Sequence, residues 1–276
     1  MMAVRTGSRT AAIRAALVVL AASGGALATT GVMAQFGPVA RPGDWVPVEG
    51  ARLRLLLGSA TPDGTVRGAL EIDLEPGWKT YWIAPGPVGI PPHLDAARST
   101  NLVLDEVGHP APGAFTEFGE VSVGYKEDVA FALRFTVPDP DAPSRLALSG
   151  FLGVCEEICV PVALRVEGDV VTGQSTPFAT GAAIRAAWAA VPPEGKDGSL
   201  AARVEGGDVV LSGPALDAGA EAFVALPDSL TLGVARRDGE TFRATVLRGE
   251  PAGTLDVVVR DGAGATHYRV PIDPGR

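Results

Sequence analysis

Short runs of alternating apolar and polar residues, interrupted by glycine and proline, dominate this chain. In the clearest run the apolar residues are Val129, Phe131, Leu133, Phe135 and Val137. A period of two predicts a β-strand with one buried face. The same reasoning predicts strands at residues 52–57, 65–74, 146–154 and 160–166, and a second set at 209–211, 222–226, 241–247, 255–260 and 267–272.

Only residues 177–191 have a helical pattern. The stretch is rich in alanine, carries Ile184 and Trp188 four positions apart, and is followed by two prolines. Residues 194–198 are polar and turn-forming, which is typical of a linker. Short strands at this spacing favour antiparallel sandwiches over alternating strand–helix units. We therefore expect a first β-domain at 35–175, a helix and linker at 176–198, and a second β-domain at 199–276.

The N-terminus has the layout of a secretory signal. Arg5, Arg9 and Arg14 precede an apolar run at 15–27, and Val32-Met33-Ala34 forms an acceptable cleavage site. The alternative is a buried N-terminal helix. We expect cleavage of residues 1–34 and a soluble, periplasmic protein without membrane insertion. Loss of the three arginines moves the formal net charge from −9 to −12, which disfavours nucleic acid and anionic lipid as partners.

The only two cysteines, Cys155 and Cys159, lie between two predicted strands. A turn of three residues can bring their Cα atoms within the roughly 4.4–6.8 Å that a disulfide needs. Closing so short a loop contributes little stability, which favours a redox couple over a structural staple. Metal binding is a third alternative. Copper(I) would lack methionine ligands, because all three methionines lie in the signal segment, and zinc would need two more ligands.

Two glutamates, Glu156 and Glu157, separate the cysteines. Negative charge near a thiol disfavours the thiolate and raises the cysteine pKa. Exchange requires a thiolate attacker. We therefore expect a pair that reacts when a partner supplies the matching environment.

Two aromatic segments could assist the cysteines. Trp78, Tyr81 and Trp82 precede a proline-rich loop at 84–92, which indicates either a recognition surface or a buried tryptophan that anchors the sandwich. Glu117 and Phe118 follow Phe115 on a glycine-bounded loop. Such an aromatic loop could cover a neighbouring site, or it could be a minor core contact.

Hydrolase and kinase chemistry has no support here, because the chain has no G-x-S-x-G, phosphate-binding or HExxH motif. The histidines His93, His109 and His267 are expected at the surface or hydrogen-bonded, without a general-base role. We expect no bound cofactor and no metal.

Together, three segments resemble the periplasmic N-terminal domain of the DsbD and ScsB thiol:disulfide interchange proteins, over roughly residues 45–170. They are the aromatic block at 77–82, the Pro-Gly-Pro-Val-Gly-Ile-Pro-Pro loop at 85–92, and the Cys-x3-Cys-Val-Pro segment at 155–161. The following region resembles the second β-domain of ScsB-like proteins. The resemblance implies an all-β protein with two immunoglobulin-like antiparallel sandwiches joined by a short helix and linker.

The resemblance also implies roles. Cys159 would attack a partner disulfide, Cys155 would resolve the mixed disulfide, and Phe118 would cap the pair. A membrane-embedded or thioredoxin-like reductase would be the electron donor. Clients would be a periplasmic disulfide isomerase or a cytochrome c maturation protein.

The chain departs from the DsbD pattern in two respects. The Cys-x3-Cys spacing is closer to the ScsB branch, and the membrane segment and the thioredoxin-like Cys-x-x-Cys module are absent. We therefore expect either a separate reductase or a protein that has left the relay. The leading hypothesis is a periplasmic dithiol/disulfide exchange protein, of protein-disulfide reductase type if it is an enzyme. The alternatives are a non-enzymatic envelope protein-binding module with a structural disulfide, and a copper-handling or copper-tolerance protein.

Overall fold

The computed structural model describes residues 39–117, 119–225 and 230–274, and these are predominantly β-strand with one α-helix. The predicted signal segment 1–34 and the predicted cap Phe118 lie outside the described residues. Among the residues described, no helix is long and apolar enough to cross a membrane.

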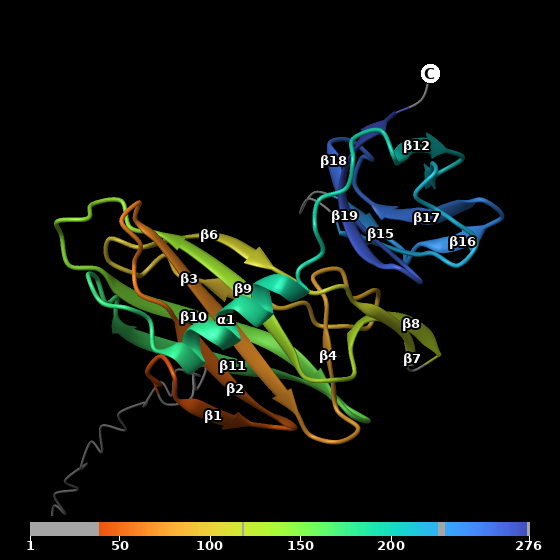
Figure 1. Cartoon of the computed structure of the whole chain (residues 1–276). Coiled ribbons are helices and arrows are strands. Elements are labelled where there is room, and N and C mark those ends of the chain that lie inside the picture. The colour runs from red at the N-terminus through yellow and green to blue at the C-terminus, as the bar shows by residue number, and fades with distance from the viewer. Residues whose placement is uncertain (1–38, 118, 226–229, 275–276) are drawn as a thin grey trace, which may run out of the picture. The chain divides into compact units, whose positions relative to one another are not determined.

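The first eleven strands form two antiparallel sheets (Figure 1). One sheet has the order β1-β2-β3-β9-β6, and the other has the order β11-β10-β4-β8-β7, with β5 paired to β10. The strands are β1 (Trp45–Val48), β2 (Ala51–Leu57), β3 (Thr65–Leu74), β4 (Lys79–Tyr81), β5 (His93–Asp95), β6 (Val103–Gly108), β7 (Gly113–Glu117), β8 (Glu120–Tyr125), β9 (Val129–Thr136), β10 (Arg145–Cys155) and β11 (Cys159–Asp169).

Strand alternation builds the core between these sheets. The predicted inner face of β9 is confirmed, because all five of its apolar residues join one buried cluster. Strand β3 divides its apolar residues between the two faces of the sheet. Leu70 belongs to the core cluster, whereas Ala69 faces the opposite side of the sheet.

Helix α1 (Phe178–Ala190) covers the outer face of the first sheet, lying across β2, β3 and β9 (Figure 1). Its Ile184 and Ala187 pack against Leu56, Ala69 and Ala132. The small alanine side chains allow the helix to approach the strands closely. The predicted helix at 177–191 is confirmed within one residue at each end, and Pro177 stands at the N-cap position.

The remaining strands surround a second apolar cluster that includes Leu211, Phe242 and Leu255. They are β12 (Ala201–Glu205), β13 (Asp208–Ser212), β14 (Glu221–Ala225), β15 (Thr231–Leu232), β16 (Arg236–Asp238), β17 (Thr241–Arg248), β18 (Thr254–Asp261) and β19 (Gly264–Asp273). Every strand of the predicted second set is present. One pairing was not expected, because β12 and β19 run parallel at Ala202 and Ile272.

The imidazole of His109 packs against the ring of Phe131, with 4.6 Å between the ring centroids. Burial lowers the pKa of His109 from 6.5 to about 4, while a hydrogen bond with the Val107 backbone acts in the opposite direction. The ring is therefore neutral in the folded protein at pH 7.

This burial predicts a pH-dependent stability. Between pH 6.5 and 4 the unfolded chain binds a proton that the folded protein does not, so the free energy of unfolding falls as the pH drops, by at most about 3 kcal/mol. Urea titrations across this range measure the slope. His109→Gln should flatten it, because glutamine carries no group that titrates in this range. Equal slopes in the wild type and His109→Gln would contradict this assignment.

Candidate functional site: the cross-strand cysteine pair

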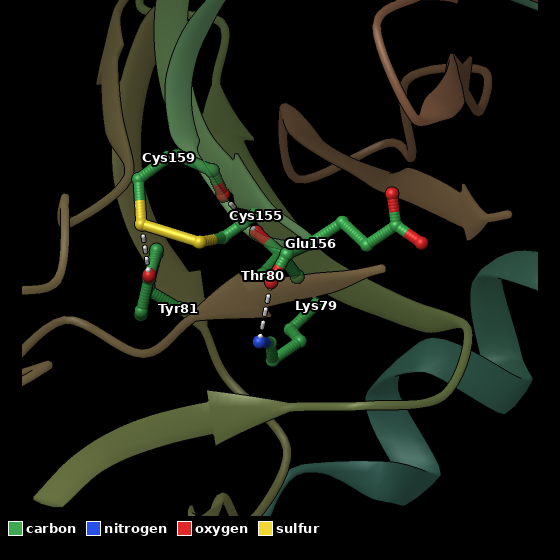
Figure 2. The surroundings of a disulfide bond; sticks show 7 residues. Lys79, Thr80, Tyr81, Cys155, Glu156 and Cys159 are labelled. Carbon is green, nitrogen blue, oxygen red and sulfur yellow. Dashed lines mark hydrogen bonds between the residues drawn. A yellow bond between two sulfur atoms is a disulfide. The ribbon is translucent and has the colours of Figure 1, made fainter. Parts of the chain in front are cut away.

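The two cysteines occupy opposite positions at the end of a β-hairpin. β10 ends at Cys155 and β11 begins at Cys159, and the two residues are direct partners in the antiparallel ladder. Their Cα atoms are 4.1 Å apart, slightly closer than the expected range, and their sulfur atoms form a disulfide (Figure 2). Glu156, Glu157 and Ile158 make the turn between them.

The disulfide faces away from the core of the sandwich. Leu152 and Val154 of β10 belong to the main core, so by alternation Gly153 and Cys155 point to the other face of the sheet. There the cysteines join a separate small cluster with Tyr81, Phe115 and Ile90. The cysteine pair therefore has its own apolar surroundings, outside the core that holds the two sheets together.

Tyr81 contacts the disulfide directly. It lies on β4, which pairs with β10 on one side and β8 on the other, and its hydroxyl oxygen is 2.9 Å from Cys159 Sγ. The ring has room because two neighbours lack side chains. A methyl group at Gly89 would lie 2.8 Å from Tyr81 Cδ1, and one at Gly153 would lie 2.9 Å from Cδ2. In the reduced protein this hydroxyl could donate a hydrogen bond to a thiolate, which would favour the charged form.

The two sulfur-bearing residues differ in exposure. Cys155 is fully buried, with an exposed fraction of 0%, whereas Cys159 is partly exposed. Ile158, directly before Cys159, is 75% exposed. A partner approaching this turn would therefore meet Cys159 before Cys155.

The charges near the pair differ from the sequence expectation. Glu156 and Glu157 are exposed, and the side chain of Glu156 points away from the sulfur atoms (Figure 2). Its Oε1 lies instead above the Gly77 turn. A positive group contacts the turn. Lys79 Nζ donates a hydrogen bond of 3.0 Å to the Glu156 carbonyl oxygen.

Phe115 lies between two lysines. Lys79 Nζ is 5.9 Å and Lys126 Nζ is 5.5 Å from the centroid of its ring. The ring also packs against Tyr81 at a centroid distance of 6.3 Å. Phe115 therefore packs within the cysteine cluster, and it lies on strand β7 where the sequence predicted a loop.

Two of the aromatic residues expected at a docking surface, Trp82 and Trp78, pack in or against the hydrophobic core. Trp82 has an exposed fraction of 2% and packs in the core of the sandwich, as the alternative of a buried tryptophan that anchors the sandwich describes. The reason is strand alternation, which sends Trp82 to the face opposite Tyr81. Trp78 is half-buried and packs over Gly50, where an added methyl group would lie 2.0 Å from the indole ring. Glu117 is the last residue of β7.

Sequence reasoning did not assign a role at the site to Lys79, Ile90 or Lys126. The available signal was the pair of glycines at 89 and 153, which leave space for a large ring on one face of the sheet. Nothing in their spacing along the chain connects them. Within the described part of the chain, no three His, Cys, Asp or Glu side chains are grouped so that they could hold a metal ion.

Comparisons with known proteins agree with this geometry. Residues 53–169 match the family model described as "Thiol:disulfide interchange protein DsbD, N-terminal". The fold is similar to the N-terminal periplasmic domain of ScsB from Proteus mirabilis, with a TM-score of 0.65 and 21% identity, covering 84% of this chain and 98% of that one. InvD of Yersinia pseudotuberculosis matches at a TM-score of 0.20 and 11% identity, over 83% of this chain and 59% of that one. No curated protein matches the chain.

The matched residues contain both cysteines, Tyr81 and Phe115, that is, the disulfide and the side chains that surround it. The fold is predominantly β and immunoglobulin-like, and apart from β12 with β19 its strands pair antiparallel within the sheets. Residues 53–169 therefore form a DsbD N-terminal-like domain of the thiol:disulfide interchange type.

Proposed function

We propose that this protein relays reducing equivalents in the periplasm by dithiol/disulfide exchange through Cys155 and Cys159. The observation that carries the proposal is the position of the disulfide. It joins opposite residues of a hairpin, outside the main core, with one sulfur-bearing residue buried and the other partly exposed. We assign the chemistry to a domain spanning residues 35–175. A helix and linker at 176–198 would connect it to a second domain at 199–276.

Exchange would proceed in two balanced steps. The Cys159 thiolate attacks one sulfur of a partner disulfide, forms a mixed disulfide and releases the partner's first thiolate. The Cys155 thiolate then attacks Cys159 Sγ, forms the internal disulfide and releases the partner's second thiolate. Two electrons pass to the partner, and the two protons that the cysteines lose are balanced by those that the partner thiolates take up. The greater exposure of Cys159 supports its role as attacker.

Partner access would control the rate. Phe115, Tyr81 and Ile90 pack around the pair, and Cys155 has no exposed surface. A partner disulfide therefore reaches Cys159 more readily when docking displaces this cover, whereas Cys155 resolves the mixed disulfide from within the hairpin. We retain Phe118, three residues after Phe115, as the proposed cap.

The proposed partners follow from the direction of transfer. A membrane-embedded or thioredoxin-like reductase would regenerate the dithiol, and a periplasmic disulfide isomerase or a cytochrome maturation protein would accept its electrons. The ScsB domain with the similar fold is described as periplasmic.

A purely structural disulfide is less consistent with the hairpin. β10 and β11 are already joined by a continuous ladder of eleven residue pairs, from Arg145–Asp169 to Cys155–Cys159. Closing a five-residue loop at the end of this ladder removes chain entropy worth only about 2 kcal/mol. The hairpin therefore has little need of a covalent link.

The reduction potential tests the redox proposal. Equilibration of the purified protein with glutathione buffers should place the Cys155–Cys159 couple above about −300 mV, in the range of exchange-active pairs. The double variant Cys155→Ser/Cys159→Ser should remain folded and lose about 2 kcal/mol in urea titration. A reduction potential well below −300 mV, together with a loss of stability in the double variant much larger than about 2 kcal/mol, would support a structural disulfide and contradict the redox proposal.

Trapping tests the roles of the cysteines. With a purified, oxidised thioredoxin-fold disulfide isomerase as probe, reduced Cys155→Ser should accumulate a mixed disulfide through Cys159. Cys159→Ser should form little, because Cys155 is buried. Non-reducing electrophoresis with peptide mass mapping measures both adducts. Accumulation in Cys159→Ser instead would reverse the assignment.

A further inference from the structure

Lys79 occupies a place on the redox face that the exchange chemistry described above leaves unused. It begins β4 and is the direct ladder partner of Cys155 on β10. Residues directly opposite in neighbouring strands project their side chains to the same face, with Cβ atoms about 4.5–5.5 Å apart. Lys79 therefore emerges on the face that carries the disulfide.

The side chain of Lys79 joins two elements that surround the pair. Its ammonium donates to the carbonyl oxygen of Glu156, the first residue of the turn between the cysteines (Figure 2). It also lies 5.9 Å from the ring centroid of Phe115, on β7. The bond to the carbonyl is charge-assisted, and such bonds are roughly twice as strong as neutral ones.

We propose that Lys79 is a positioning residue for thiol-disulfide exchange. This inference rests on the proposed function and deepens it. Lys79 holds the turn through the Glu156 carbonyl, and thereby fixes where Cys155 and Cys159 lie when they are reduced. Its positive charge, on the same face as the sulfur atoms, favours the thiolate that attacks.

Other charged and titratable groups surround the pair. The Tyr81 hydroxyl contacts Cys159 Sγ. The ammonium of Lys126 contacts the ring of Phe115, as that of Lys79 does. On the turn, the Glu156 carboxylate points toward Gly77 and Glu157 is exposed. On β5, which pairs with β10, the exposed His93 packs against Phe151 with 5.6 Å between ring centroids. On β7, Glu117 pairs with Glu120 in the ladder. Among the contacts described, Lys79 is the cation that bonds the turn itself.

Three variants separate this role from simple packing. Lys79→Met removes the donor and the charge but keeps an unbranched apolar side chain against Phe115. Lys79→Arg restores both donor and charge. Lys126→Met is the matched control, because Lys126 also contacts Phe115 and makes no described bond to the turn. Circular dichroism and urea titration first establish that each variant is folded.

The measurement is the pH dependence of iodoacetamide alkylation of the reduced full chain, with each cysteine followed by peptide mass mapping. Lys79→Met should raise the midpoint of the more reactive cysteine by about one pH unit. Alkylation at pH 7 should slow about threefold, because the tenfold smaller thiolate fraction is partly offset by the higher nucleophilicity of a more basic thiol. Lys79→Arg should restore the wild-type profile, and Lys126→Met should leave it unchanged.

Three results would each overturn the inference: an unshifted profile in Lys79→Met, an equal shift in Lys126→Met, or no restoration by Lys79→Arg. The inference and the proposed function can fail separately. A wild-type dithiol that does not reduce the isomerase probe would reject the relay, while the alkylation profiles would still decide what Lys79 does to the thiols.

Discussion

The register of β10 against two of its neighbours, β11 and β4, determines the candidate site. Pairing with β11 sets Cys155 opposite Cys159, and pairing with β4 sets Lys79 opposite Cys155. A shift of one residue in either ladder would turn the affected side chains to the other face of the sheet. The disulfide, the lysine and Tyr81 lie together because three strands agree in register. The larger hydrophobic core, on the opposite face of this sheet, is what keeps those strands aligned.

The site also shows how an apolar cluster can be separate from a core. The main cluster of the sandwich holds the two sheets together, while Tyr81, Phe115 and Cys155 form a small group on the outer face. A group of this size can rearrange at modest cost, because the sheets beneath it do not depend on it. Reactivity and stability are therefore assigned to opposite faces of the same strands.

Strong alternation made much of the fold predictable. The core faces of β3 and β9 and the position of α1 follow from local patterns, and so does the placement of the cysteines between two strands. The short strand β4 could not be predicted from a local pattern. Its three residues are too few to show alternation, and its partner strands lie more than forty residues away in the chain. The opposite fates of Tyr81 and Trp82 depend on that strand. Lys79 was unpredictable for the same reason, since its contact with Glu156 spans 77 residues.

Helix α1 covers the outer face of the sheet that lies on the far side of the core from the cysteines. One broad face of the first sandwich is thereby closed to strands or helices of other proteins, while the disulfide occupies the other. A protein that accepts electrons from one partner and passes them to another through a single face must take the two in turn. If the proposed relay holds, electron donor and client would compete for one binding surface. Exchange would then follow ping-pong kinetics without a ternary complex.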